Sequence, residues 1–86
     1  MAVRVTIEAR SRAAAEVVAQ CLGTEARPRT RRGWGVIQVV AKNAAETAGI
    51  VDKVSGLLEE HHDLDWVRVR YGDESHVFRS NGRRSA

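Results

Sequence analysis

Polar and apolar residues alternate over the first ten positions, which is the period of a β-strand with one buried face. Val3, Val5 and Ile7 fall on one side, and the residues between them fall on the other. A run rich in β-branched residues and two further alternating segments have the same character. Together these patterns predict strands over residues 2–10, 36–41, 66–71 and 75–79.

Two other segments repeat their apolar residues every three to four positions, as helices with one buried stripe do. The first spans residues 12–22 and follows Ser11, whose side chain can cap the helix. The second begins near Ala44, after Asn43 as a capping residue, and ends around residues 61–63. Both helices are predicted to cover the same sheet.

The segment between the helices is rich in arginine, and we interpret residues 27–41 as a β-hairpin. Pro28 disfavours helix and suits an edge strand. Gly33 and Gly35 flank Trp34 and favour a turn or bulge. One strand preceded by a long arginine-rich loop is the alternative.

The resulting order, βαββαβ with an extra C-terminal strand, predicts an α+β fold, a two-layer ferredoxin-like sandwich with both helices on one face. We expect one domain over residues 1–79 and a flexible basic tail over residues 80–86. The predicted core consists of Val3, Val5, Ile7, Val17, Val18, Leu22, Ile37, Val39, Val51, Val54, Leu58, Val67 and Val69.

At 86 residues, with 43% hydrophobic and few aromatic residues, the chain offers little core for a deep cavity, which favours self-association. Its single cysteine, Cys21, excludes an intramolecular disulfide and a cysteine-based zinc cluster. We place Cys21 in the core and the protein in the cytoplasm. No run is long and apolar enough for a membrane span, and the N-terminus lacks the continuous apolar stretch of a signal peptide.

Charge is uneven along the chain. Residues 1–33 carry a net charge of +4, residues 34–65 of −4 and residues 66–86 of +3. The positive charge comes from twelve arginines and two lysines, and arginine binds carboxylates and phosphates in a bidentate way. Either a bipolar interaction surface or simply the codon bias of a GC-rich genome explains this composition.

The arginines concentrate in the predicted hairpin and on the sheet face that the helices leave open. If the valines of the first and fourth strands face the helices, the open face holds Arg4, Thr6, Glu8, Arg10, Trp66, Arg68 and Arg70. The candidate binding surface consists of Arg4, Arg27, Arg29, Arg31, Arg32, Trp34, Trp66, Arg68 and Arg70.

Residues 32–39, Arg-Gly-Trp-Gly-Val-Ile-Gln-Val, are similar to the octamer on the third strand of RNA-recognition motifs. The resemblance implies base stacking on an open sheet. The sequence departs from that pattern, since Val36 and Val39 stand where the family has aromatic residues, and Arg4 stands where the partner strand has one. Glycines at a hairpin end also explain the octamer without RNA.

Histidines and acidic residues follow the second helix, but their spacing does not suit a metal. His61 and His62 are adjacent and diverge by about 100° on a helix. Asp63, Asp65 and His76 add no reliable ligand spacing. Glycine-rich phosphate loops, paired carboxylates after strands and serine-nucleophile motifs are missing from the sequence. We therefore expect no catalytic residues, no metal and no cofactor.

The C-terminal half resembles the effector-associated constant component family of actinobacterial conflict systems. The similarity rests on residues 36–40, an Ala-rich helix through Ile50, Val54 and Leu58, residues 67–73, and residues 76–78. It implies a bacterial protein that acts as a small non-catalytic adaptor, coupling a sensor or protease to an effector.

Taken together, these features predict a non-catalytic protein-interaction domain that binds a protein partner or itself as a homo-oligomer. The alternative is a nucleic-acid-binding module that uses the arginine-rich hairpin and the basic open face. Membrane binding is not expected.

Overall fold

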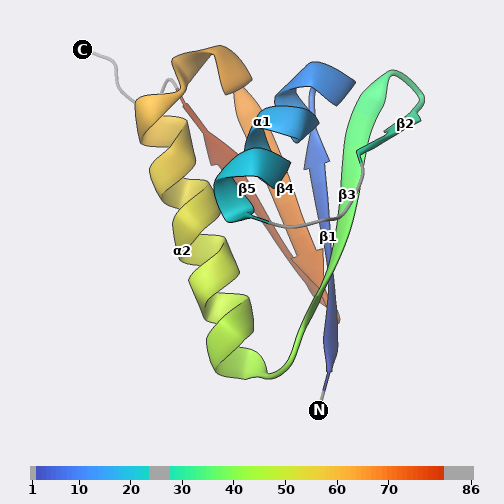
Figure 1. Cartoon of the computed structure of the whole chain (residues 1–86), viewed down its shortest axis with the longest axis vertical. Helices are drawn as coiled ribbons and strands as arrows, with labels where there is room; N and C mark the ends of the chain where they lie inside the picture. Colours follow the sequence, from blue (N-terminus) through green and yellow to red (C-terminus); the bar gives the residue numbers. More distant parts are fainter. Residues whose placement is uncertain (1, 24–27, 81–86) are drawn as a thin grey trace.

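A sheet and two helices packed on one of its faces form two layers in the computed structural model (Figure 1). The structure describes residues 2–23 and 28–80. The elements are β1 (Val3–Ala9), α1 (Arg12–Leu22), β2 (Arg29–Arg31), β3 (Trp34–Ala41), α2 (Ala44–Glu60), a 3₁₀ turn η1 (His62–Leu64), β4 (Trp66–Tyr71) and β5 (Glu74–Arg79). The predicted α+β class is confirmed.

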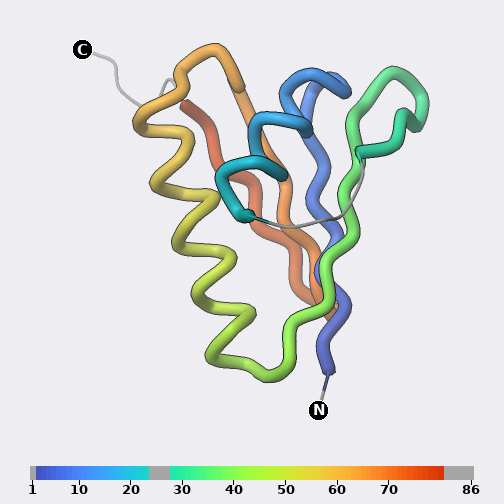
Figure 2. Tube along the Cα trace, in the orientation of Figure 1, coloured from blue at the N-terminus to red at the C-terminus, as the bar shows by residue number. Residues whose placement is uncertain are grey.

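The five strands lie in the order β2-β3-β1-β4-β5, and every neighbouring pair is antiparallel. The trace in Figure 2 shows β1 in the middle of the sheet, with β3 and β4 beside it. Ile7 of β1 pairs with Ile37 of β3 and with Val69 of β4. Alternate residues of these strands therefore face the helices or the open side.

The core lies between the sheet and the helices. Eight of the thirteen predicted core residues are buried, and the other five are partly buried against them. The apolar faces of the strands and the apolar stripe of α2 were therefore predicted correctly. Leu64 of η1 is also buried and closes the core below the end of α2.

Helix α1 begins and ends where the sequence predicts, but its buried side is rotated. The Ser11 side chain accepts a hydrogen bond from the backbone N–H of Ala14 (3.1 Å). Ala15 and Ala19 face the core, whereas Cys21 is exposed. The prediction of Cys21 in the core was wrong, because the small alanines allow α1 to approach the sheet closely on their side.

Helix α2 is capped as predicted. The Asn43 side chain accepts from the backbone N–H of Glu46 (2.9 Å), and the Glu46 carboxylate accepts from the backbone N–H of Lys42 (3.1 Å). The helix ends at Glu60, just before His61. No helix in the described ranges, 2–23 and 28–80, is long and apolar enough to span a membrane.

The arginine-rich segment forms a short hairpin rather than one strand and a long loop. Strand β2 has only three residues, and Arg32 and Gly33 make the turn with φ angles of 55° and 85°. Glycine tolerates such a positive φ without strain. Arg27, part of the predicted hairpin and of the candidate surface, lies outside the described residues.

Candidate interaction surface on the open sheet face

One face of the sheet carries no helix, and we call its outward residues the open face. The pairing of the strands places on it every second residue of each strand. The open face consists of Arg4, Thr6 and Glu8 of β1; Arg29 and Arg31 of β2; Trp34, Val36, Gln38 and Val40 of β3; Trp66, Arg68 and Arg70 of β4; and Ser75, Val77 and Arg79 of β5.

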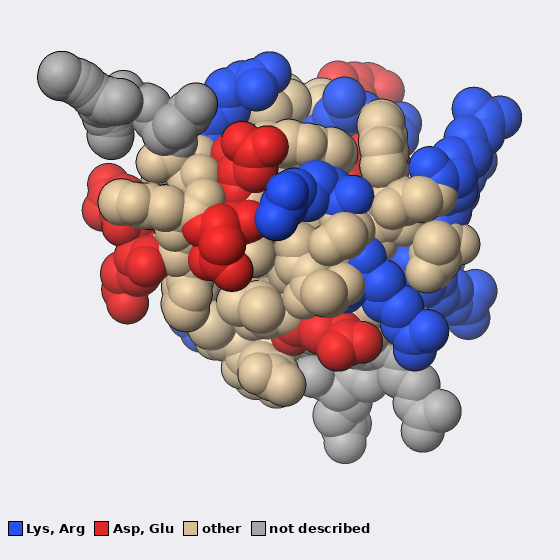
Figure 3. Space-filling view, turned by 90° about the horizontal axis from the view of Figure 1, so that it is seen from above, with Lys and Arg blue, Asp and Glu red and all other residues tan. Residues whose placement is uncertain are grey.

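The open face is strongly basic. It holds six arginines and one carboxylate, that of Glu8. Figure 3, which looks down on the molecule of Figure 1, shows Lys and Arg gathered mainly on the side of the β2–β3 hairpin and most Asp and Glu on the side of α2. The surface is therefore bipolar in the way that the charge pattern of the sequence predicts.

The single carboxylate of the open face, that of Glu8, forms ion pairs with two of the arginines. The Glu8 side chain is only 7% exposed, and its two oxygens lie 3.3 Å from Nη1 of Arg68 and 4.0 Å from Nη1 of Arg70. Arg68 sits directly across from Glu8 in the β1–β4 ladder. The ion pair therefore holds Arg68 against the sheet and leaves Arg70, at the longer distance, more freely exposed.

Two tryptophans meet across the end of β1. Gly35 and Val67 both pair with Ala9, so Trp34 and Trp66 flank the point where β1 ends. Their ring centroids are 5.3 Å apart at an interplanar angle of 77°, an edge-to-face contact. The guanidinium carbon of Arg68 lies 5.6 Å from the Trp34 ring centroid, within cation–π range.

A shallow hollow of about 380 Å³ lies beside this tryptophan pair. Its lining residues are Glu8, Arg31, Arg32, Trp34, Arg68 and Arg70. The fold thus brings together five of the nine residues predicted for the binding surface. Arg4 lies toward the other end of β1, across from Val40. Arg29 and Trp66 share the open face but do not line the hollow.

Two valines outside the predicted binding surface are exposed. Val40 and Val77 are 63% and 48% exposed, and with Trp34, at 39%, they are the large exposed hydrophobic residues of the described chain. All three lie on the open face. Alternation contained the signal, because Val40 and Val77 fall on the side of their strands that faces away from the helices, and a sheet with one open face exposes that side.

The structure places the histidines that were weighed as metal ligands, among them His61 and His76, in different parts of the fold. His61 follows the last residue of α2, and Nε2 of His76 lies 3.1 Å from the Tyr71 hydroxyl. Within residues 2–23 and 28–80, no three His, Cys, Asp or Glu side chains are placed to hold a metal ion. That the protein uses no metal stays a prediction.

Neither a protein-family model, nor a curated protein, nor a solved structure matches the chain. What the open face binds is therefore inferred from its own chemistry.

Proposed function

We propose that this chain is a non-catalytic interaction module that binds a partner protein through its open face. One observation carries the proposal: Trp34, Val40 and Val77 are all on that face, which also carries six arginines. Aromatic residues and arginine are enriched at protein interfaces, and lysine and glutamate are depleted. The open face contains no lysine and only one glutamate.

The charge of the open face defines the kind of partner. Six arginines against one buried carboxylate favour an acidic partner surface that also has apolar side chains to contact Trp34, Val40 and Val77. Complementary charge speeds association and selects against basic partners, and the apolar contacts supply affinity. The partner that we propose is therefore an acidic protein surface.

Three finer assignments belong to this proposal: the fold, the role and the compartment. The order β2-β3-β1-β4 with both helices on one face supports a ferredoxin-like sandwich, to which β5 adds an edge strand. The resemblance of residues 36–78 to the effector-associated constant component family supports an adaptor role. Cys21 is a free and exposed thiol, which supports the reducing cytoplasm as the compartment.

Replacing Val40 by Glu should strongly weaken partner binding, because the carboxylate repels an acidic surface and removes one of the three exposed apolar residues of the open face. We expect the amount of partner recovered from native cells on immobilised protein to fall at least about tenfold. Ala48→Glu is the matched control, since Ala48 is an exposed residue of α2 and receives the same charge change. A protein retained equally by both variants would not be bound through the open face.

Single-stranded nucleic acid is the second candidate, favoured by the hollow beside Trp34. Arg31 and Arg32 form no ion pair with any other residue that the structure describes, so both can contact phosphate. Trp34 offers part of an aromatic ring to a base. The centre of the face, however, presents Thr6 and Gln38 rather than further aromatic residues. This candidate therefore ranks second.

A titration with labelled single-stranded RNA and DNA at about 50 mM salt tests the second candidate, since charge contacts are strongest at low salt. If both arginines contact phosphate, the double substitution Arg29→Ala with Arg31→Ala should reduce the slope of the logarithm of the binding constant against the logarithm of salt concentration by roughly two. Trp34→Ala should weaken binding with little change in that slope. Failure to bind at low salt would remove nucleic acid from consideration.

A further inference from the structure

The two edges of the sheet are built differently. At one edge, β2 has three residues, two of them arginines, and follows Pro28. At the other, β5 has six residues, and the four in its middle, residues 75–78, carry no acidic, lysine or arginine side chain and no proline. Short strands, charges and prolines are the means by which proteins prevent edge-to-edge pairing. β2 therefore protects the edge of β3 over residues 34–36, where the two strands pair, whereas β5 carries no such protection along its middle.

We propose that β5 pairs with β5 of a second copy of this chain, antiparallel, about a two-fold axis at Val77. The pairing joins two five-stranded sheets into one continuous sheet. It uses the edge of the sheet rather than the open face, so it does not depend on the partner binding proposed above.

Among residues 2–23 and 28–80, no strand pairs with the outer side of β5, which leaves its backbone available for such pairing. Gly72 and Asp73 form a two-residue turn that closes the ladder between Tyr71 and Glu74. In a two-residue hairpin, the two residues that flank the turn direct their backbone N–H and C=O groups toward each other, between the two strands. Along each strand these groups then point alternately toward the partner strand and away from it. Every second residue, starting with Ser75 and including Val77, therefore turns its N–H and C=O toward the outer edge.

The side chains of β5 are complementary to those of a second β5, so a second copy of the chain is the partner that fits this edge. Residues directly opposite in a ladder share a face, so a two-fold axis must pass through a single residue rather than between two. An axis at Val77 pairs Val77 with itself, His76 with Phe78 and Ser75 with Arg79 of the second copy. Apolar groups then meet apolar groups and rings meet rings, with no like charges opposite.

An axis at His76 is the nearest alternative, and it matches less well. It would place Glu74 opposite the ring of Phe78 and His76 opposite itself. The axis at Val77 places Arg79 opposite Ser75 of the second copy, so neither charged end of β5 faces a like charge or an apolar ring.

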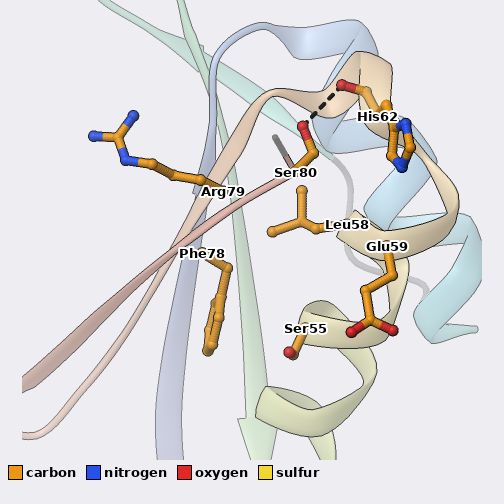
Figure 4. A pocket seen from close by; sticks show the side chains of 7 residues that line it. All are labelled: Ser55, Leu58, Glu59, His62, Phe78, Arg79 and Ser80. Atoms are coloured by element: carbon orange, nitrogen blue, oxygen red, sulfur yellow. Dashed lines mark hydrogen bonds between the residues drawn. The ribbon is translucent and has the colours of Figure 1, made fainter. Parts of the chain in front are cut away.

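The end of β5 is held firmly, which favours pairing at this edge. Figure 4 shows Ser80 turned toward His62, and its hydroxyl donates to the His62 carbonyl (2.8 Å) and to the Asp65 carbonyl (3.2 Å). The Ser80 backbone N–H donates to the Asp65 carbonyl at 2.9 Å. Ser80 was predicted to begin the flexible tail; instead it is buried and anchors the strand, while residues 81–86 lie outside the described residues.

A hollow on the helix side of β5 leaves room for the second copy. It has a volume of about 380 Å³ and is lined by Ser55, Leu58, Glu59, His62, Phe78, Arg79 and Ser80 (Figure 4). With the axis at Val77, the second copy's His76 lies opposite Phe78, at the rim of this hollow. Its Glu74 lies opposite Ser80, near His62. Side chains from the second copy can therefore enter without displacing the core.

Val77→Lys tests the proposal, because a lysine at the centre of an edge prevents pairing. Light scattering over a concentration series, under reducing conditions, should show a dimer for the unmodified chain with a Kd of roughly 10–100 µM, as suits a small interface. Val77→Lys should weaken association at least about tenfold. Val40→Lys is the matched control, since Val40 is also exposed on the open face but lies in β3, on the opposite side of the sheet from β5.

A cross-linking experiment covers the case in which Val77→Lys fails to fold. In a Cys21→Ser background, Val77→Cys should form a disulfide dimer on mild oxidation, and Val40→Cys should not. A chain that stays monomeric up to about 1 mM would overturn the proposal. So would a dimer that Val40→Lys dissociates as readily as Val77→Lys, since the open face would then be the interface.

Discussion

Gly35→Ala should lower the free energy of unfolding by about 2–3 kcal/mol, because overpacking at a rigid contact costs this much. A Cβ at position 35 would lie 2.6 Å from Cβ of Ala15 and 2.9 Å from Cα of Arg12, and would overlap the carbonyl oxygen of Ser11. Two of these atoms belong to the backbone of α1 and its cap, so relief requires the helix to move away from the sheet.

Gly49→Ala provides the control in the same chain. Gly49 is exposed within α2, and a Cβ there meets no atom within 4 Å. Alanine should therefore stabilise the helix by about 0.5–1 kcal/mol. Urea unfolding of both variants should give changes of opposite sign. Equal changes in the free energy of unfolding for Gly35→Ala and Gly49→Ala would mean that α1 does not pack closely on Gly35.

Ile7→Ala should lower the free energy of unfolding by about 3–4 kcal/mol, as large-to-small changes in cores do. Ile7 is completely buried in the central strand, between Ile37 and Val69. For a chain of this size, the loss corresponds to a fall in Tm of roughly 12–30 °C, measurable by circular dichroism.

Val40→Ala is the comparison for Ile7→Ala, because Val40 lies on the open face at 63% exposure. Its truncation should change stability by less than about 0.5 kcal/mol. If Val40→Ala were as harmful as Ile7→Ala, β3 would be shifted by one residue, which would exchange its two faces.

The main elements of the fold could be predicted because their signals are local. The alternation around Val5 and Ile7, the caps Ser11 and Asn43, and the apolar stripe of α2 each depend on neighbouring residues. The position of Cys21 could not be predicted in this way. Its exposure depends on how α1 is rotated over Gly35, a contact with a distant strand.

In the candidate surface, too, some features depend on neighbouring residues and could be predicted, whereas others depend on contacts between distant segments. The arginines of the open face follow from alternation along β1 and β4. The contact of Trp34 with Trp66 and the ion pair of Glu8 with Arg68 do not, because both depend on the register of β1 with β3 and β4. That register is set by packing and turns far along the chain.

The central position of β1 has a consequence for synthesis. The strand is made first, yet one of its neighbours, β3, ends at Ala41 and the other, β4, ends at Tyr71. Until β4 has been translated, β1 has a free edge, and Glu8 lacks both arginines that neutralise it. Long-range pairing of this kind folds slowly and exposes strand edges on the way. We therefore expect a nascent or truncated chain that stops before Trp66 to be recognised by chaperones or proteases rather than to fold as a smaller version of the domain.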